Sequence, residues 1–584
     1  MVVKMNPKII DAIFAVLVFS IPFKYIPKIF WQSFLGGPFG SDLVFYPLAV
    51  GFIYTAYCQW KYGNVIYQWN KFKKFIIIYL LVLFISLVHG LANFPYYEQI
   101  LNGPVTQIQR LPSVLVLLSN VGIRLDEVTA LKFWMLGRPI KGILFESLYT
   151  FGAGYMIFCW YHNRKKRAFE LVRKTVIVNL IVIAGYGIID VCYQNGQLWA
   201  QNILTAINPI LHASPTLYSS YDAADWHPAL YWDGQVRSIF LEPSYFGIYM
   251  AFAFPILVWA IFKENKIVYK IGLEILFFLL AFELFLGQSR TGVAISTGEA
   301  FILVVVCIYL HTRKFIDLLL SLVVVATFAF GSSLGFINYE QVPVTIGTPL
   351  ATRWVEVHSE AEGSNAVLVK KGYADVDTKD YFGEAIGSLS NNGKTQKHEG
   401  SNHSRFIVIK TNIRIGEKHP VFGVGNGLHN AYLRDILSED PGDEIQMWNR
   451  VMDKSGWMRG VFPNLGDWFV RFAETGVLGL LVFAFPLMTA ICHLGFKVLN
   501  RKSLIGKANI DCIFILISLV GLAATGIGDS LNNMFCCWLM LSMAFLEIHG
   551  GEYRKVENKK ISHGKEENIQ LFELSQSWLC FNEF

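Results

Sequence analysis

Charged residues are scarce in this sequence. Of its 584 residues, 16% are Asp, Glu, Lys or Arg, whereas 53% are hydrophobic, and the mean hydropathy is +0.41. A soluble globular domain usually has about a quarter of its residues charged, so this composition excludes an ordinary soluble protein. The formal net charge of +6 comes mostly from Lys and Arg in short loops. It therefore indicates no nucleic-acid partner.

Cysteine patterns that would staple a fold or hold a metal are also lacking. The long polar segments carry no cysteine, and the nine cysteines lie in apolar runs or in the C-terminal tail. This distribution shows no disulfide framework and no zinc-ligand spacing. The first apolar run is followed by Pro22 and Pro27 rather than by a small-residue cleavage site. We therefore expect a retained signal anchor.

Long apolar runs are what the sequence does have. Runs of about 17–22 residues are long enough to cross a hydrocarbon core of about 30 Å. About twelve of them recur along the chain, near residues 9–30, 42–60, 75–92, 143–161, 175–193, 243–262, 271–287, 292–310, 315–337, 476–496, 509–528 and 533–549. The pattern predicts an all-α, polytopic membrane protein.

The distribution of Lys and Arg predicts the orientation. One set of short connections is rich in these residues, for example Arg164–Arg167 and Lys263–Lys270, whereas the alternate connections have few. Basic loops tend to stay in the cytoplasm, so we expect both termini inside and Arg237, Arg290 and residues 338–475 outside. The apolar stretch 111–123 would reverse this pattern if it crossed the membrane. We therefore interpret it as an interfacial or re-entrant helix.

These observations predict four regions. Residues 1–337 would hold the first nine transmembrane helices, with outer loops at 93–142 and 194–238. Residues 338–475 would form a large outer loop, which is too long to lack helices of its own. Residues 476–549 would hold the last three spans. Residues 550–584 would form a cytoplasmic tail that is either amphipathic at the membrane surface or poorly ordered.

Arginine occurs in three short phrases on the expected outer side. They are Arg237-Ser-Ile-Phe-Leu-Glu242-Pro243, Gln288-Ser-Arg290-Thr-Gly and His403-Ser-Arg405. A helix capped by Ser404 is predicted to run from there to just before Pro420, with His403, Lys410 and Arg414 on one face. The following Val421-Phe-Gly-Val-Gly-Asn-Gly427 is either a phosphate-binding nest or a plain turn, and the plain turn is favoured because the strand-loop-helix context is missing.

Carboxylates within the predicted spans require a partner or a cavity. Glu283 and Glu299 lie on the two helices that flank Arg290, which predicts either a structural ion pair with Arg290 or the floor of a substrate pocket. Glu274, Asp511 and Glu547 lie near cytoplasmic ends of spans and are expected at the interface.

A cluster of arginines outside a bilayer suits an anionic, lipid-linked substrate. Arginine stays charged and binds phosphate oxygens through two N–H groups at once. Fixed cations of this kind stabilise the charge that develops on a departing diphosphate. A general base would help to deprotonate an acceptor hydroxyl, and the candidates on the outer side are His227, Glu242, His403, His429 and Asp467. For any single one of them, a structural or solvated role is favoured over a role as the base.

Several phrases, in order, resemble the O-antigen ligase/polymerase superfamily. They are Phe240-Leu-Glu-Pro-Ser, Ser289-Arg-Thr-Gly, the Arg405-led segment ending in Pro420-Val-Phe-Gly-Val-Gly, and Ala473-Glu-Thr-Gly-Val-Leu-Gly-Leu. The resemblance covers roughly residues 235–490. It implies a GT-C-type glycosyltransferase of the bacterial inner membrane that uses undecaprenyl-diphosphate-linked oligosaccharide, with neither metal nor other cofactor. It also implies a polysaccharide chain-length regulator as a partner.

The resemblance further implies roles for single residues. Arg290 and Arg405 match the two functional arginines of the family. With His429 and Glu242 they form the predicted catalytic set, while Arg237, Arg414, Lys410 and His403 are the predicted substrate ligands.

One departure bears on the reaction. Ligases carry a His-Asn pair shortly before the Ala-Glu-x-Gly phrase, whereas this sequence has Pro463-Asn-Leu-Gly-Asp467 there. Together with Leu241-Glu-Pro-Ser, this favours a repeat-unit polymerase over a ligase. A flippase of similar span count is less favoured, because the distinctive residues gather on one side and no repeated halves are visible.

Overall fold

The computed structural model describes residues 5–24, 42–63, 66–67, 69–102, 111–211, 235–310, 313–337, 400–437, 464–499 and 510–550. These residues form helices and connecting turns, with no strand among them. The predicted all-α class is confirmed. Most of the expected outer loop 338–475, residues 212–234 of the expected outer loop 194–238, and nearly all of the expected tail lie outside the described residues.

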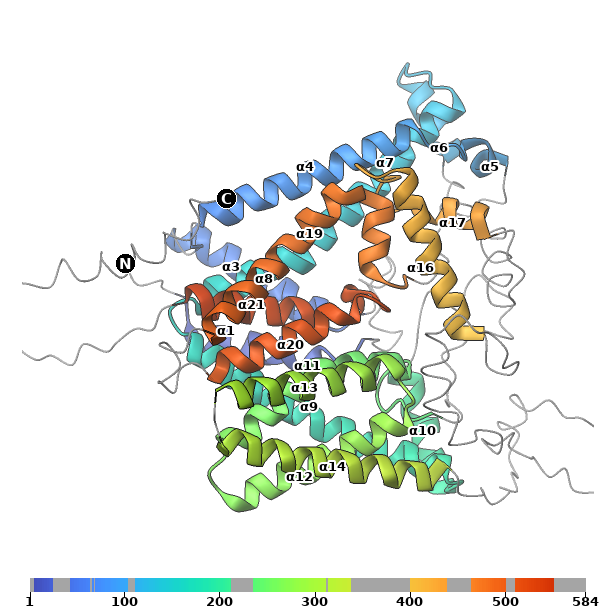
Figure 1. The fold of residues 1–584 in the computed structure, drawn as a ribbon. Coiled ribbons are helices and arrows are strands. Elements are labelled where there is room, and N and C mark those ends of the chain that lie inside the picture. The colour runs from blue at the N-terminus through green and yellow to red at the C-terminus, as the bar shows by residue number, and fades with distance from the viewer. Residues whose placement is uncertain are drawn as a thin grey trace, which may run out of the picture.

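A bundle of helices forms most of the molecule (Figure 1). Each of the predicted apolar runs overlaps one of its helices: α1 (Pro7–Ser20), α3 (Phe45–Tyr62), α4 (Asn70–Ala92), α7 to α8 (Glu127–Tyr161), α9 (Lys165–Gln194), α11 (Pro243–Lys263), α12 (Ile267–Leu286), α13 (Arg290–Tyr309), α14 (Arg313–Ile337), α19 (Asp467–Leu499), α20 (Ile510–Thr525) and α21 (Cys536–His549). Seven of the described helices are long and apolar enough to cross a membrane: α4, α7–α8, α9, α11, α13, α14 and α19.

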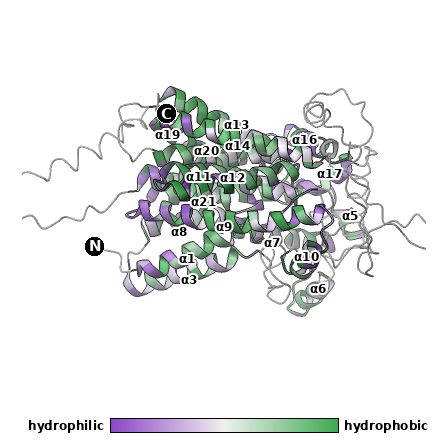
Figure 2. Cartoon of the chain, turned by 90° about the horizontal axis from the view of Figure 1, so that it is seen from below, coloured by the Kyte–Doolittle hydropathy of each residue, from purple (hydrophilic) through white to green (hydrophobic). Residues whose placement is uncertain are grey.

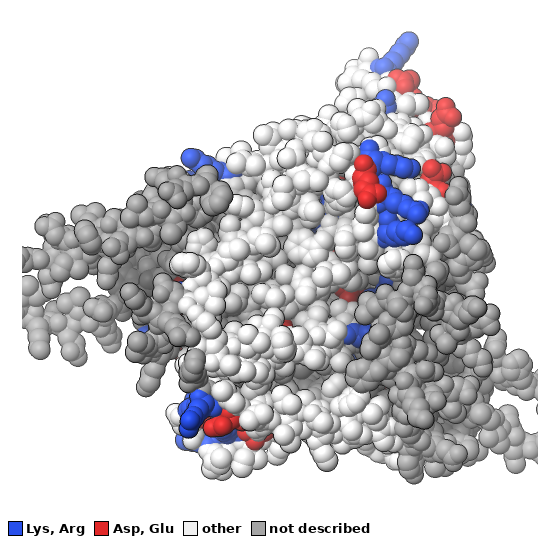
Figure 3. Space-filling view, in the orientation of Figure 1, with Lys and Arg blue, Asp and Glu red and all other residues white. Residues whose placement is uncertain are grey.

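The outside of the bundle is apolar along its middle. Large hydrophobic side chains point outward, among them Ile77 at 64% exposure, Phe301 at 68% and Phe328 at 67%. Figure 2 shows hydrophobic residues concentrated along the middle of the bundle, and Figure 3 shows charged side chains gathered toward its ends. An apolar belt between polar ends is the surface that a lipid bilayer requires. The chain is a multi-pass membrane protein.

Helix α11 lies at the centre of the bundle. It packs against α9, α12, α13, α20 and α21, and nearly all of its side chains are buried. Its approach to α13 depends on two glycines, because a Cβ atom on Gly247 would lie 2.9 Å from the Cα atom of Gly292. Small residues at such crossings let membrane helices come close. The first turns of α11 and α13 are thereby held together.

Ion pairs mark one end of the bundle, called here the basic end. Lys165 and Lys497 both pair with Glu547, with a Lys165 Nζ–Oε2 distance of 3.2 Å, and Lys263 pairs with Asp511 at 2.5 Å. Glu547 and Asp511 therefore have partners from the Lys-rich connections, in agreement with their expected position near the ends of spans. Helices α5 (Tyr97–Asn102), α6 (Leu111–Asn120), α10 (Leu198–Leu211), α16 (Gly400–Lys418) and α17 (His429–Leu437) lie toward the opposite end (Figures 1 and 2).

Several helix boundaries differ from the predicted ones; for example, α1 ends at Ser20 instead of near residue 30, and α9 begins at Lys165 instead of near residue 175. The span expected at 143–161 begins at Glu127 and contains a π-helical turn, η2 (Leu148–Gly152). The span expected at 476–496 begins at Asp467 and bends at Gly476, which has φ +63°. The stretch 111–123 contains α6, whose ten residues are too few to cross a bilayer. This agrees with an interfacial helix.

The predicted ion pair of Arg290 with Glu283 or Glu299 is wrong. The carboxylate oxygens of both glutamates are buried and have no hydrogen-bond partner among the described residues. Glu283 packs against Gly187 of α9, and Glu299 packs against Gly521 of α20. The two side chains turn toward other helices because only glycine leaves room for them there.

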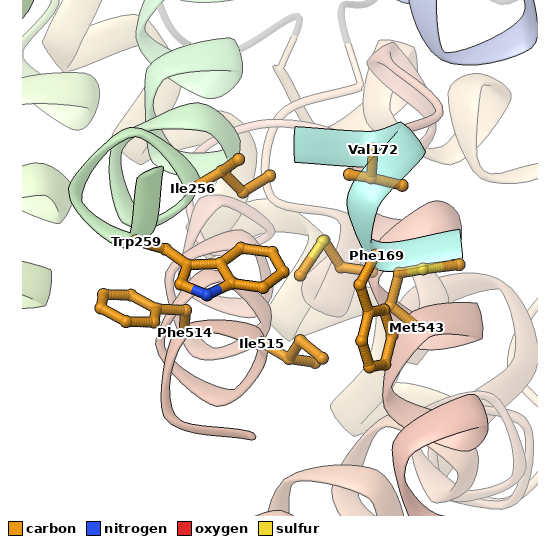
Figure 4. A pocket seen from close by; sticks show the side chains of 8 residues that line it. Phe169, Val172, Ile256, Trp259, Phe514, Ile515 and Met543 are labelled. Carbon is orange, nitrogen blue, oxygen red and sulfur yellow. The ribbon is translucent and has the colours of Figure 1, made fainter. Parts of the chain in front are cut away.

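A small apolar pocket lies among α9, α11, α20 and α21 (Figure 4). It is lined by Phe169, Val172, Ile256, Trp259, Phe514, Ile515, Met540 and Met543. Trp259 also packs under Lys263, whose Nζ atom lies 4.5 Å from the ring centroid, so the pocket is on the side of the basic end. It offers almost no polar group to a ligand and we regard it as a packing gap.

Candidate active site

A turn between α20 and α21 organises the end opposite the basic end. Helix α20 starts beside the basic end at Asp511, so the turn at residues 526–535, which follows Thr525, lies at the other end. The backbone N–H of Asp467, at the start of α19, donates to the Asp529 carbonyl at 3.2 Å, and that of Trp468 donates to Gly526 at 3.4 Å. The turn is thus fixed to α19.

Arg405 reaches this turn from α16. Its Nη1 atom lies 3.4 Å from Oδ1 of Asp529, and the two side chains are 31% and 6% exposed. Helix α16 is held in place by its packing along α19, where Gly416 leaves room for the ring of Phe472. A buried carboxylate therefore holds one edge of the guanidinium group, and the rest remains open to solvent or to a ligand.

Glu242 lies in the electrostatic field of the same arginine. It occupies the N-cap position of α11 and accepts a hydrogen bond from the Ser244 hydroxyl at 3.2 Å. Burial raises the pKa of Glu242, while the positive charge of Arg405 opposes that rise. Arg405, Asp529 and Glu242 are called here the Arg405 cluster. It combines a fixed cation with a carboxylate that binds protons more readily than usual.

A second cation borders the cluster. Lys24 donates to the Asn533 carbonyl at 2.8 Å, and its ammonium lies 4.7 Å from the ring centroid of Tyr245. Burial lowers the pKa of Lys24, and the carboxylates of Asp42 and Glu242 oppose that shift. Burial also raises the pKa of Asp42 to about 7. The N-terminal segment therefore contributes charge to the same end of the bundle.

Arg290 begins α13, as predicted from its position at the start of a span. The hydroxyl of Ser289 caps the helix by accepting from the Gly292 N–H at 3.4 Å. The side chain of Arg290 is exposed. The next residue, Thr291, faces the turn, since a Cβ atom on Gly528 would lie 3.7 Å from the Thr291 hydroxyl. The start of α13 therefore adjoins the same turn that Arg405 contacts from α16.

His429 contacts a different carboxylate. Its Nδ1 atom lies 2.6 Å from Oε1 of Glu474, and the same oxygen accepts from the Gly427 N–H at 2.8 Å. Both side chains are 9% exposed. His429 thus joins α17 to α19, and its role as a general base stays a prediction.

The glycine-rich segment after Pro420 is a plain turn and not a phosphate nest. Four of its N–H groups already have protein acceptors; among them, Val424 donates to the Ala473 carbonyl at 2.9 Å, and Gly425 donates to the Glu474 carbonyl at 2.8 Å. Val477, just after the bend at Gly476, donates back to Pro420 at 2.8 Å. The Ala473-Glu-Thr-Gly phrase is therefore the surface on which this turn rests.

The other predicted substrate ligands are spread over this end. Arg237 is 2% exposed and donates from Nη1 to the Leu241 carbonyl at 3.1 Å, while its backbone N–H donates to Asp190 at 2.9 Å. Lys410 and Arg414 lie exposed on α16, and Figure 3 shows basic side chains gathered near this helix. The side chain of His403 lies outside the described residues. The substrate-binding roles of all four stay predictions.

One boundary of α16 was predicted wrongly. The helix begins at Gly400 instead of after a Ser404 cap, so His403 and Arg405 lie within it. Its end at Lys418, before Pro420, is as predicted. The sequence does not fix one N-cap position here, because Ser401, Asn402 and Ser404 are all good cap residues.

Sequence reasoning missed the polar residues of the 526–535 turn. Ser530 donates to Asp467 at 3.5 Å, and Asn532 donates to Glu146 at 2.9 Å. Glu146 also pairs with Arg471 of α19. The available signal was the phrase Gly526-Ile-Gly-Asp-Ser-Leu-Asn-Asn533, a polar stretch between two apolar runs. This stretch contains no Lys or Arg, so the search for cationic phrases did not find it.

The described residues include no group of three or more His, Cys, Asp or Glu side chains arranged to hold a metal ion.

Comparison with known proteins gives one family. Residues 275–484 match the family model described as O-antigen ligase. This segment runs from α12 to α19 and includes Arg290, Arg405, His429 and Glu474. No curated protein and no solved structure matches the chain.

Proposed function

We propose that this chain polymerises a bacterial cell-surface polysaccharide, and the match of residues 275–484 to the family model described as O-antigen ligase supports a function of this type. In this proposal it joins oligosaccharide repeat units carried on undecaprenyl diphosphate, at the outer face of the inner membrane. The observation that carries the proposal is the Arg405 cluster, in which the partly exposed Arg405 side chain contacts Asp529 and exerts an electrostatic effect on Glu242, whose pKa is raised by burial.

The reaction assigns each charge a role. The hydroxyl oxygen of the acceptor sugar attacks the anomeric carbon of the donor, and the bond from that carbon to the diphosphate oxygen breaks. Arg405 and Arg290 stabilise the negative charge that the departing diphosphate gains. Glu242 takes the proton of the acceptor hydroxyl. Atoms and charge balance with no metal and no other cofactor.

The position of the cluster supports a lipid-linked donor. The cluster lies at the end of the bundle opposite the Lys-rich connections, and basic loops favour the cytoplasmic side. The diphosphate of a lipid anchored in the outer leaflet would lie at this level. A GT-C-type arrangement and a site facing the periplasm are parts of the proposal.

Polymerase is favoured over ligase by residues in two places. Glu242 with Pro243 opens α11 within electrostatic reach of Arg405, and the segment before Ala473 lacks the His-Asn pair expected of ligases. His429 instead pairs with Glu474.

The test is turnover by the purified protein. Given an undecaprenyl-diphosphate oligosaccharide alone, the wild type should produce a ladder of longer glycans, and Arg405→Ala and Arg290→Ala should abolish it. Arg124→Ala is a matched control, because Arg124 is exposed in the connection between α6 and α7. Transfer only to an added lipid or protein acceptor would indicate a ligase. Movement of the lipid across a vesicle membrane without a new glycosidic bond would indicate a flippase.

A further inference from the structure

Asp529 is buried beside Arg405 but has no assigned role. Its side chain is 6% exposed, its Oδ1 atom faces Arg405, and its Oδ2 atom has no hydrogen-bond partner among the described residues. Taking a carboxylate out of water is costly unless a cation compensates for it. Arg405 supplies that compensation.

The backbone of Asp529 is fixed from two sides. Its N–H donates to the Thr525 carbonyl at 2.9 Å, and its carbonyl accepts from the N–H of Asp467 at 3.2 Å. The neighbouring Ser530 also donates to the Asp467 carboxylate at 3.5 Å. Asp529 therefore lies on a turn anchored to α20 and α19. The guanidinium of Arg405, in contrast, lies at the end of a long side chain.

We propose that Asp529 is a positioning residue, which fixes the guanidinium of Arg405 toward the diphosphate of the donor. This inference rests on the proposed function. One N–H of the guanidinium faces Asp529, so the remaining N–H groups stay available to phosphate oxygens in a fixed direction. The side chain of Arg405 is 31% exposed, which leaves that edge accessible.

Asp529 and Glu242 thus have different roles in the Arg405 cluster. Asp529 is the carboxylate in contact with Arg405, and burial leaves it little access to an acceptor sugar. Glu242 is only partly buried and accepts a hydrogen bond from its near neighbour Ser244, so its carboxylate can still take a proton. Because Asp529 acts through Arg405, its removal should affect the reacting state more than substrate binding.

The experiment is a double-mutant cycle with Asp529→Asn and Arg405→Lys. Loss of a residue that orients a ligand typically costs 10–100-fold. We expect Asp529→Asn to lower kcat by about 10–100-fold and to change KM by less than about 3-fold. On the Arg405→Lys background, the same change should cost less than about 3-fold, because the interaction it removes is already gone. Asp126→Asn, an exposed helix cap that Asn preserves, is the control.

Each alternative has its own outcome. Asp529→Asn turnover within about 2-fold of the wild type, or losses that multiply in the double variant, would overturn the positioning role. Turnover is normalised to monodisperse protein, and a merely structural role would lower the melting temperature without this coupling. If Arg405→Ala retains full turnover, the proposed function itself fails, and the inference falls with it.

Discussion

Charges in the Arg405 cluster influence one another because little water separates them. Burial raises the pKa of both Glu242 and Asp529, while Arg405 lowers the pKa of each. Lys24 adds a second cation near Glu242. A carboxylate in this setting can exchange a proton at a pH nearer neutrality than an exposed one. That property suits a group that must accept a proton during each turnover.

The pH profile tests this role of Glu242. Only the ionised carboxylate can accept a proton, so activity should fall as the pH falls through a pKa raised above the ordinary value of a glutamate. Glu242→Gln should lower kcat by about 10²-fold or more and remove that acidic limb. The exposed Glu98→Gln is the control. An unchanged profile in Glu242→Gln would assign the proton to another group.

The same shift has a consequence for stability. A carboxyl whose pKa is higher in the folded state binds protons more tightly there, so its contribution to stability declines as the pH rises toward the folded-state pKa. Glu242→Gln removes this decline. The melting temperature of the variant minus that of the wild type should therefore be larger at pH 8 than at pH 5. The reverse order would contradict the raised pKa.

In the structure, His429 contacts the buried carboxylate of Glu474. This contact indicates a structural role for the histidine. In His429→Ala, the Glu474 carboxylate keeps the Gly427 N–H but loses its nearest side-chain partner. The free energy of unfolding should fall by about 2 kcal/mol. Thermal unfolding of the purified protein measures this, with the exposed His89→Ala as control. Full stability with lost turnover would instead support a catalytic histidine.

Among the elements, the bend of α19 at Gly476 has the strictest requirement. Its φ of +63° disfavours any side chain, and a Cβ atom there would lie 2.7 Å from the Phe422 nitrogen. Gly476→Ala should therefore destabilise the protein by more than about 2 kcal/mol and disrupt the turn after Pro420. Gly427→Ala is a matched control, with φ +77° but open space around it. It should cost only about 1 kcal/mol. Equal melting temperatures would show that crowding at Gly476 is relieved.

Helices were easier to predict than the contacts between them. Long apolar runs fix where α11 or α20 must lie, because a bilayer allows few alternatives. The Arg405–Asp529 pair joins residues 124 positions apart, and no local pattern encodes such a partner. The start of α16 was also missed, since several good cap residues occur together. Packing across the bundle, and not propensity, decided these features.

At the scale of the whole molecule, charge distribution predicts which end faces the cytoplasm. The basic end has Lys263 and Lys497 paired to Asp511 and Glu547, and the Arg405 cluster lies at the opposite end. A lipid-linked donor on the outer leaflet requires the cluster to face outward. The orientation is therefore a prediction on which the proposed chemistry depends.

Cysteine labelling in intact cells tests the orientation. Ser119→Cys in the exposed part of α6 should react with a membrane-impermeant maleimide before the cells are opened, whereas Tyr62→Cys at the end of α3 should react only afterwards. The unsubstituted chain is the control for its native cysteines. The positive-inside rule is the physical reason for this order. Labelling of Tyr62→Cys alone in intact cells would place the Arg405 cluster in the cytoplasm, where an outer-leaflet diphosphate could not reach it.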